Sequence, residues 1–338
     1  NKSVLRISLI SQRAPNDVYR SIFRGLVVSI PHEFSNISMK WFEYLSQPRI
    51  GESFFRALHS AENILSFEGG RYLGPKFVKQ NPEGESAGSV GLRSGGNYLI
   101  TGGLGNVGLL LAQLVVKEKK LNLFLLSRDI LNKDPRVFEV IDQLKSSGCY
   151  VEVIQADVTQ NIEFVLSDIE KRFGPLQGVF HCAGRPGKAQ HRIHNITRSD
   201  GDEFFDSKIS GSERLVNYFK NKNLDFCFFI SSTTAILGGM GDALYSSANI
   251  FEKYLIERMA SSSITGKWLA LDFDYLPRVI PDQASPNLGN FGASLFENAL
   301  TEADFSEVIE SVFSFASGAY VISKTDLNKR VERIKSNT

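Results

Sequence analysis

The sequence predicts an α/β fold with a doubly wound parallel sheet of seven strands, preceded by a smaller N-terminal unit. From Asn97 onward, short apolar runs alternate with segments of helical periodicity, which is typical of parallel strands joined by crossover helices. The first of these runs ends in a glycine-rich turn at residues 101–108. A chain of 338 residues, of which 42% are hydrophobic, is also long enough for such a sheet and a second, modest unit.

The N-terminal unit is expected to span residues 1–79 and to be a degenerate, Rossmann-like half of a nucleotide-binding fold. Two strands, two amphipathic helices and a hairpin are expected in it, at Leu5–Ile10, Ile37–Tyr44, 17–29, 52–62 and 64–78. Gly69 and Gly70 would supply the turn of the hairpin. The first strand is followed by SQRAPND, which lacks the glycines of a phosphate-binding turn. We therefore expect this unit to bind no dinucleotide.

The larger unit is expected to span residues 97–338, after a linker at residues 80–96. The linker is predicted because that stretch is rich in Gly, Ser, Glu, Pro and Asn. Seven strands are expected in the larger unit, at Tyr98–Thr101, Leu123–Leu126, Tyr150–Gln155, Gly178–His181, Phe226–Ser231, Lys267–Asp272 and Tyr320–Ser323. Because the strands are parallel, ligands are expected at the edge where their carboxyl ends meet.

The glycine-rich turn, TGGLGNVG, joins the first of these strands to a helix. A backbone almost free of side chains can approach a pyrophosphate, whose charge the helix N-terminus stabilises. We therefore expect a Rossmann-type dinucleotide site, and the alternative is a turn that only packs helix against strand. The residues expected to contact the cofactor here are Thr101, Gly102, Gly103, Leu104, Gly105, Asn106, Val107 and Gly108.

The end of the second strand indicates which dinucleotide is bound. A carboxylate at this position would bind the ribose 2′-hydroxyl of NAD, but Ser127 and Arg128 occupy it. Because a guanidinium suits phosphate oxygens, NADPH is expected rather than NADH. The alternative is that Arg128 is merely exposed and that Asp129 discriminates. Further cofactor contacts are expected where the third and fourth strands end, from Asp157, Val158, Ala183 and Gly184.

Four polar residues have a spacing that suggests a catalytic group. Tyr245 follows Ser232, at the end of the fifth strand, by thirteen residues. Asn249 lies four residues after Tyr245 on a predicted helix, so both side chains share one face. Lys208 lies on the helix that precedes the fifth strand. Ser231 replaces Ser232 if the register is shifted by one residue.

These four residues, with the glycine turn, resemble the ketoreductase domains of modular polyketide synthases, a branch of the short-chain dehydrogenase/reductase superfamily. Ordinary members of that superfamily carry the lysine four residues after the tyrosine. Here Asn249 stands at that position and Lys208 lies upstream, which is typical of the polyketide branch. EGGRYLGPKF, at residues 68–77, resembles the end of the family's structural subdomain.

The resemblance implies NADPH-dependent reduction of a β-ketoacyl thioester to a β-hydroxyacyl thioester. The substrate would be carried on the phosphopantetheine arm of an acyl carrier protein, and other domains of the same synthase would be further partners. Tyr245 would protonate the alkoxide that hydride addition leaves, and the Lys208 ammonium would favour the phenolate. Ser232 would donate a hydrogen bond to the carbonyl oxygen, and Asn249 would hold Lys208 or a relay water. Each residue alone has an ordinary structural explanation, so the inference depends on all four together.

The family's substrate entrance corresponds to residues 185–197 and to a lid at about 275–300, and Arg185, Leu237 and Pro277 are the expected contacts. B-type members carry Leu-Asp-Asp where this chain reads RPGK, and A-type members carry tryptophan at the position of Leu237. The missing aspartate favours an L-configured alcohol, whereas the missing tryptophan counts against it.

Other functions remain as alternatives. The N-terminal unit is short for the family's structural subdomain, which leaves open an α-ketoacyl reductase within a nonribosomal peptide synthetase. A nucleotide-sugar epimerase or dehydratase would carry lysine at position 249. A scaffold domain that reduces nothing would not bind NADPH.

Composition excludes several other partners. The net charge of +1 and the lack of a basic stripe disfavour nucleic acid and anionic membranes, and no apolar run is long enough to cross a bilayer. Three cysteines without CxxC spacing fit a reducing compartment, so we expect a cytoplasmic protein. Because the chain begins at Asn1, we read it as a piece of a larger protein. His191 and His194 lack further ligands at suitable spacing, so no metal is expected.

Overall fold

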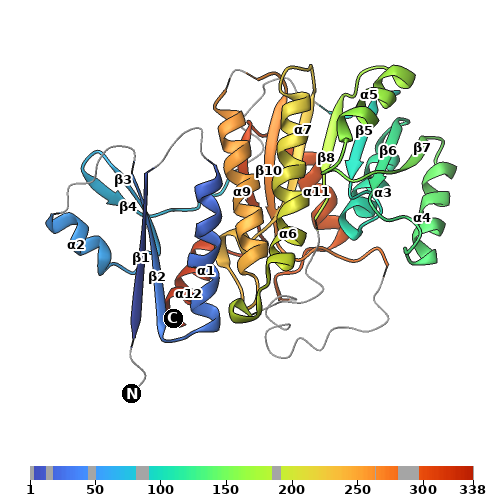
Figure 1. The fold of residues 1–338 in the computed structure, drawn as a ribbon. Helices are drawn as coiled ribbons and strands as arrows, with labels where there is room; N and C mark the ends of the chain where they lie inside the picture. The colour runs from blue at the N-terminus through green and yellow to red at the C-terminus, as the bar shows by residue number, and fades with distance from the viewer. Residues whose placement is uncertain are drawn as a thin grey trace.

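The structure is a computed structural model that describes residues 4–12, 18–44, 51–80, 91–184, 192–262, 264–280 and 297–337. Two sheets organise it, a four-stranded sheet near the N-terminus and a seven-stranded sheet formed by the later part of the chain (Figure 1). Every neighbouring pair in the larger sheet is parallel. The predicted α/β fold, with a doubly wound seven-stranded sheet and a smaller N-terminal sheet, is therefore confirmed.

The smaller sheet has the strand order β1-β2-β3-β4. Its first three strands are parallel, and the fourth pairs antiparallel with the third. Their bounds are β1 Leu5–Gln12, β2 Ile37–Tyr44, β3 Ile64–Glu68 and β4 Arg71–Leu73. Gly69 and Gly70 join β3 to β4 with φ of +55° and +82°, the backbone that a two-residue hairpin turn requires. The predicted hairpin is confirmed.

The two N-terminal helices differ from prediction at their ends. A 3₁₀ turn at Tyr19–Ile22 leads into α1, Phe23–Glu33, which includes Pro31 in its last turn. The second helix, α2, spans Glu52–Leu58 and stops short of residue 62. Lys40 donates hydrogen bonds from Nζ to the carbonyl oxygens of Ser60 (2.5 Å) and Glu62 (2.6 Å), and these tertiary contacts hold the chain outside the helix.

The larger sheet has the strand order β11-β10-β9-β8-β5-β6-β7. Its strands are β5 Asn97–Thr101, β6 Asn122–Ser127, β7 Tyr150–Gln155, β8 Gly178–His181, β9 Phe226–Ser232, β10 Lys267–Phe273 and β11 Gly318–Ile322. The chain runs outward from β5 to β7 and then returns to β8 on the other side of β5. The carboxyl ends of β5 and β8 therefore flank the point where the strand order reverses, which is where doubly wound sheets bind ligands.

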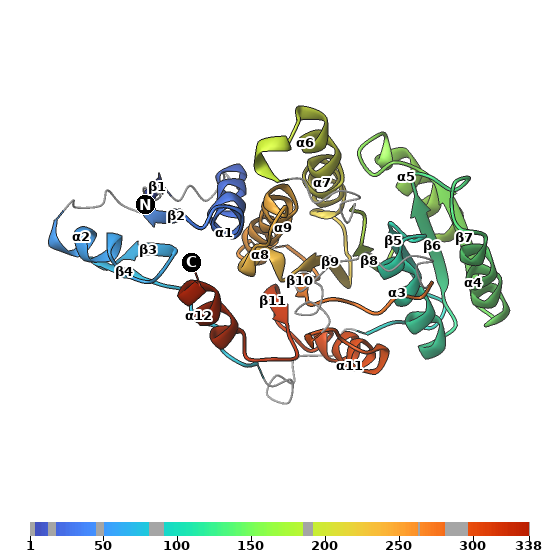
Figure 2. The same ribbon diagram turned by 90° about the horizontal axis from the view of Figure 1, so that it is seen from below.

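Helices cover both faces of this sheet (Figure 2). One face carries α3 Asn106–Glu118, α4 Pro135–Ser146 and α11 Glu302–Val312, and the other carries α5 Ile162–Phe173, α7 Ser212–Phe219 and α9 Ala243–Ala260. Each face buries its own apolar cluster against the strands. The remaining helical segments are η3 Ile193–Asn195, α6 Arg198–Phe205, η4 Asp206–Gly211, α8 Thr234–Leu237 and α12 Leu327–Asn337.

Helix α1 lies between the small sheet and α9 (Figure 1). A Cβ atom at Gly25 would lie 2.2 Å from Oγ of Ser247, so glycine is what lets α1 approach α9 this closely. The C-terminal helix α12 also contacts the N-terminal part of the chain. Asn328 exchanges two hydrogen bonds with the backbone of Phe77, and Lys335 pairs with Glu62 at 2.6 Å.

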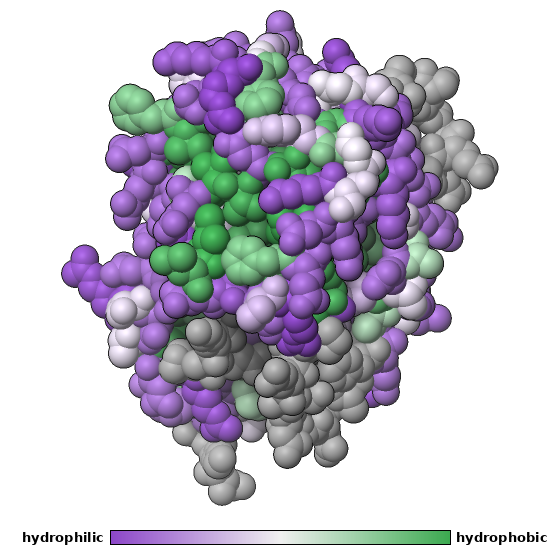
Figure 3. All heavy atoms as spheres, turned by 90° about the vertical axis from the view of Figure 1, so that its right-hand side faces the viewer, coloured by the Kyte–Doolittle hydropathy of each residue, from purple (hydrophilic) through white to green (hydrophobic). Residues whose placement is uncertain are grey.

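Strand β7 forms one edge of the larger sheet. Figure 3, which faces that side of the molecule, shows a band of hydrophobic residues between hydrophilic ones. Phe138 of α4, Tyr150 of β7 and Phe164 of α5 are large hydrophobic residues with exposed surface. Glu152 of β7 pairs with Arg172, and such charges discourage other chains from pairing with an open edge. Among the described residues, none of the helices combines the length and hydropathy needed to cross a bilayer.

Candidate active site

The glycine turn leaves β5 at the buried residue Thr101 and enters α3, for which Gly105 is the N-cap. Gly102 has a φ of +66°, and a Cβ atom there would lie 2.8 Å from the carbonyl oxygen of Cys182, just after β8. A Cβ atom at Gly108 would lie 2.4 Å from the carbonyl oxygen of Gly102. The first turn of α3 therefore packs directly against the loop, and the helix begins beside the carboxyl end of β5, next to the point where the strand order reverses.

Other residues of this turn use their side chains within the protein. Leu104 is buried in the core, and Val107 packs partly against the same cluster. Asn106 donates from Nδ2 to the carbonyl oxygen of Pro277 and accepts at Oδ1 from the N–H of Val279, both at 2.8 Å. The segment that follows β10 is thereby fixed against the glycine turn, and Pro277 lies at the predicted cofactor site.

The end of β6 carries one buried and two exposed polar residues. The buried one, Ser127, donates from Oγ to the carbonyl oxygen of Asp129 at 2.9 Å. The Asp129 carboxylate accepts hydrogen bonds from the side chain and backbone of Asn132, and these bonds lower the pKa of Asp129. Arg128 is exposed, and its guanidinium lies 4.0 Å from the Asp157 carboxylate. Asp129 is thus engaged locally, whereas Arg128 extends towards solvent beside the neighbouring strand end.

The ends of β7 and β8 carry the other predicted cofactor contacts. Asp157 accepts hydrogen bonds from the backbone and hydroxyl of Thr159, and the side chain of Val158 is buried in the core. The N–H of Ala183 lies 3.4 Å from Oγ1 of Thr101. A Cβ atom at Gly184 would lie 2.9 Å from Cε of Lys208. The backbone after β8 therefore passes between the glycine turn and Lys208.

Lys208 lies in η4, a π-helical segment between α6 and α7. Such wide turns are frequent at functional sites. The side chain is buried, and Nζ donates to the carbonyl oxygen of Ile230 at 3.2 Å and to Oε2 of Glu252 at 2.5 Å. Burial by itself would lower the pKa of Lys208, but the negative charge of Glu252, with that of a Tyr245 phenolate, raises it above its ordinary value.

Tyr245 and Asn249 lie in the first part of α9, beside the end of β9. Tyr245 is partly exposed, and its ring centroid lies 6.4 Å from that of Phe204 on α6. Asn249 is fully buried, donates from Nδ2 to the carbonyl oxygen of Tyr245 at 2.9 Å and accepts at Oδ1 from Oγ of Ser231 at 3.1 Å. Ser232 is partly exposed, and its oxygen accepts a 3.3 Å hydrogen bond from the N–H of Thr234, so its own O–H can still donate.

The structure thus brings the four predicted catalytic residues to the carboxyl end of β9, but their contacts differ from prediction in one respect. Asn249 was expected to hold Lys208 or a relay water, and its hydrogen bonds to described residues go to Ser231 and Tyr245. Glu252 holds Lys208, and the sequence prediction missed it. The available signal was its position three residues after Asn249, which puts an acidic side chain on the same helix face.

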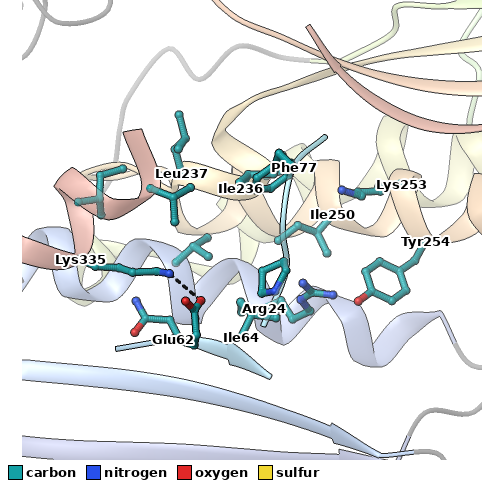
Figure 4. A pocket seen from close by; sticks show the side chains of 16 residues that line it. Arg24, Glu62, Ile64, Phe77, Ile236, Leu237, Ile250, Lys253, Tyr254 and Lys335 are labelled. Atoms are coloured by element: carbon teal, nitrogen blue, oxygen red, sulfur yellow. Dashed lines mark hydrogen bonds and ion pairs between the residues drawn. The ribbon is translucent and has the colours of Figure 1, made fainter. Parts of the chain in front are cut away.

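Leu237, predicted to contact substrate, lines a cavity of about 130 Å³ between α1, α8, α9 and α12 (Figure 4). On α9 the lining residues are Ile250, Lys253 and Tyr254. Tyr254 lies nine residues after Tyr245, which puts these two rings on opposite sides of the helix. Arg185, another predicted substrate contact, lies outside the described residues. So do His191 and residues 281–296 of the predicted lid. Within the described residues, no group of three or more His, Cys, Asp or Glu side chains is arranged to hold a metal.

A doubly wound parallel sheet, a glycine turn after its first strand and a tyrosine with a buried lysine at the strand ends define an oxidoreductase of the short-chain dehydrogenase/reductase type, which uses a nicotinamide cofactor. Comparison with known families makes the assignment narrower. Residues 96–273, more than half of the chain, match the KR domain family. The chain belongs to this family, the ketoreductase domains of polyketide synthases.

Curated relatives agree with the assignment. Polyketide synthase PksM of Bacillus subtilis (strain 168) is 34% identical over 165 residues, which are 48% of this chain and 4% of that protein. Reducing polyketide synthase FUB1 of Gibberella moniliformis is 25% identical over 250 residues, 70% of this chain and 10% of that protein. The chain therefore spans a tenth or less of the length of these relatives.

Several solved structures share the fold over 98% of this chain, and two of them illustrate it. One is a ketoreductase domain from the bacillaene assembly line, with a TM-score of 0.80, 20% identity and 80% of that chain covered. The other is an adenylation, ketoreductase and pseudo Asub multidomain structure of a keto acid-selecting NRPS module, with a TM-score of 0.82, 18% identity and 29% of that chain covered.

Proposed function

We propose that this domain reduces the β-keto group of an acyl thioester with NADPH, giving a β-hydroxyacyl thioester during polyketide chain assembly. The observation that carries the proposal is the meeting of Lys208, Ser232, Tyr245 and Asn249 beside the glycine turn. The acyl chain would arrive on the phosphopantetheine arm of an acyl carrier protein. The length of PksM and FUB1 relative to this chain supports work inside a larger synthase.

The residues around the glycine turn fit NADPH. A Cβ atom at Gly102 or Gly108 would clash with neighbouring backbone, so these glycines let α3 begin directly at the turn, where its N-terminus could bind a pyrophosphate. Arg128, exposed at the end of β6, offers a guanidinium to a ribose 2′-phosphate. Asp129 is a poor partner for a ribose hydroxyl because its carboxylate already accepts hydrogen bonds from Asn132.

The side chains divide the chemistry between them. NADPH, when bound, would supply the hydride that converts the ketone into an alkoxide. Tyr245 donates its phenolic proton to that oxygen, and Ser232 donates a hydrogen bond to the same oxygen as negative charge develops there. The Lys208 ammonium stabilises the phenolate that remains. Asn249 holds the backbone of Tyr245 and the hydroxyl of Ser231, so it fixes the geometry of the acid.

The proposal is tested by NADPH consumption with a β-ketoacyl N-acetylcysteamine thioester. Tyr245→Phe removes only the phenolic hydroxyl, and we expect kcat to fall about a hundredfold or more because the general acid is lost. Tyr254→Phe is the matched control, since Tyr254 lies on the same helix but lines the cavity between α1 and α12. Equal rates for wild type and Tyr245→Phe would remove Tyr245 from the mechanism.

The same assay separates the two substrate classes. An α-ketoacyl thioester of equal length is offered in parallel, because a ketoreductase of a keto acid-selecting NRPS module shares this fold. We expect the higher kcat/KM with the β-keto substrate. The opposite preference would assign the domain to α-keto reduction.

A further inference from the structure

Helix α9 carries a fully buried carboxylate, Glu252, beneath the catalytic residues. Three polar groups surround it. Oε2 accepts from Nζ of Lys208 at 2.5 Å, Oε1 accepts from Oγ of Ser212 at 3.0 Å, and Nε2 of His181 lies 3.4 Å from Oε1 without the alignment of a hydrogen bond. The carboxylate therefore joins α9 to the π-helical segment and to the end of β8.

Burial of Glu252 and Lys208 makes each depend on the other. An isolated charge in the protein interior is strongly disfavoured, and removing one partner of a buried pair leaves the other uncompensated. An apolar pair of similar volume often gives equal or greater stability, so the pair is a poor source of stability by itself. Because the ion pair includes the catalytic lysine, we infer that it serves the reaction rather than stability.

Lys208 is fixed from several sides by contacts that leave part of its ammonium available. Two of the three N–H groups are accounted for by Glu252 and by the carbonyl oxygen of Ile230 on β9. Gly184, after β8, lies against the aliphatic part of the side chain. A lysine anchored in this way loses little freedom when a ligand binds, and its charge stays at one place.

Four further titratable groups face the pair. His181 and Cys182 come from the end of β8, Tyr245 from α9 and Asp272 from β10. Nδ1 of His181 lies 2.7 Å from Oγ1 of Thr101, at the start of the glycine turn. The carboxylate thus sits between the catalytic lysine and the loop expected to bind the cofactor.

We propose that Glu252 is a positioning residue, whose buried carboxylate holds the Lys208 ammonium in place and keeps it charged beside Tyr245. The inference rests on the proposed function only where it links the lysine to catalysis. The ion pair itself can be measured in the protein without substrate or cofactor. Loss of the carboxylate leaves burial as the main influence on the lysine, which then favours its neutral form.

Lysine Nζ resonances, followed by NMR through a pH titration of ¹⁵N-lysine-labelled protein, test the pair directly. The Lys208 signal is assigned by its absence in Lys208→Met. In wild type we expect it to remain in the ammonium form at about pH 10, since its pKa is raised. In Glu252→Gln we expect the titration midpoint to fall by about two pH units or more. Glu257→Gln, on the same helix, should leave it unchanged.

Two results would overturn the inference. The wild-type lysine could titrate below its ordinary range, which needs no variant to detect and so does not depend on how well Glu252→Gln folds. Alternatively, Lys208 could keep its wild-type midpoint in folded Glu252→Gln. Either result would overturn the inference whether or not the protein reduces a ketone.

The pH profile of thioester reduction provides the catalytic readout. In Glu252→Gln we expect kcat to fall about tenfold or more as the pH is raised from 6.5 to 9, because Lys208 loses its proton over this range. KM should change little. Glu252→Asp should restore part of the wild-type profile, because it keeps the charge. A purely structural role would instead lower kcat equally at every pH.

Discussion

Arg128 is the residue on which we expect the choice between NADPH and NADH to depend. Its guanidinium is exposed at the end of β6, and its nearest described carboxylate, Asp157, lies 4.0 Å away, a separation too long for a strong hydrogen bond. A 2′-phosphate could therefore engage the guanidinium fork without first displacing a tightly held partner. Asp129, the residue that would favour NADH, is held by Asn132.

Arg128→Ala is expected to weaken NADPH binding about tenfold or more, because a charge-assisted contact is lost, and to leave NADH binding nearly unchanged. Fluorescence titration of both cofactors measures the two dissociation constants. Arg93→Ala is the matched control, since Arg93 is also exposed but pairs with Asp225 at the opposite, amino end of the strands. Similar weakening of both cofactors would argue against a role for Arg128 in discrimination.

The site residues were predictable to different degrees. Lys208, Ser232, Tyr245 and Asn249 could be proposed because their spacing along the chain is itself informative. Glu252 was not found, because its partner Lys208 lies 44 residues away and only the fold brings the two together. The contact of Asn249 with Ser231 was not predicted for the same reason, since only the fold brings the end of β9 beside α9.

Helix α3 and the glycine turn act as one element. The helix can begin where it does only because Gly108 lets its first turn pass the carbonyl oxygen of Gly102. The apolar side of α3 is at the same time buried against the sheet, so the helix has little room to retreat. Packing therefore depends on Gly108, and we expect cofactor binding to depend on the same glycine.

Gly108→Ala is expected to weaken NADPH binding about tenfold or more and to lower the free energy of unfolding by about 1–3 kcal/mol, since the added methyl overpacks backbone atoms. Urea unfolding and cofactor titration measure the two effects. Gly201→Ala serves as the control, because no atom lies within 4 Å of the added Cβ on α6, and alanine there should stabilise the helix by about 0.5–1 kcal/mol. Unchanged cofactor affinity in Gly108→Ala would contradict this account of the turn.

Elements were predictable where local pattern decides them. The seven strands of the larger sheet lie within a few residues of the predicted ones, because short apolar runs bounded by polar turns are characteristic of buried parallel strands. The predicted ends of α1 and α2 were wrong. The contacts of Lys40 with the carbonyl groups of Ser60 and Glu62 are tertiary and leave no periodicity in the sequence.

The whole molecule combines two sheets through α1, α9 and α12, and this arrangement was not predicted. Gly25 gives no sign in the sequence that it will meet Ser247 on α9. The same fold also buries a carboxylate, Asp272 of β10, whose oxygens have no hydrogen-bond partner within the described residues. Ser231, its neighbour on β9, donates its hydroxyl to Asn249.

Asp272 should make the stability of the whole molecule depend on pH. Burial raises its pKa to about 6, whereas an unfolded chain has an aspartate pKa of about 3.9. The folded protein therefore holds this proton more tightly. The stabilisation is fully present below about pH 4 and is lost as pH rises through about 6.

Asp272→Asn mimics the protonated side chain at every pH. Relative to wild type, its free energy of unfolding should be similar near pH 4 and higher by as much as about 3 kcal/mol at pH 7. Urea unfolding at both pH values measures the difference, and Asp142→Asn, at an exposed position on α4, should show no such dependence. A difference that does not vary with pH would mean that Asp272 does not carry this charge in the folded protein.

The central claim is that this domain delivers hydride from NADPH to a ketone held beside Tyr245. The most direct measurement uses NADPH deuterated at C4 of the nicotinamide, in each of its two configurations, with a β-ketoacyl thioester and mass and NMR analysis of the product. The account predicts a single deuterium on the new carbinol carbon from one configuration and none from the other. A product without deuterium from either form, or no alcohol at all from a protein that binds NADPH, would contradict it.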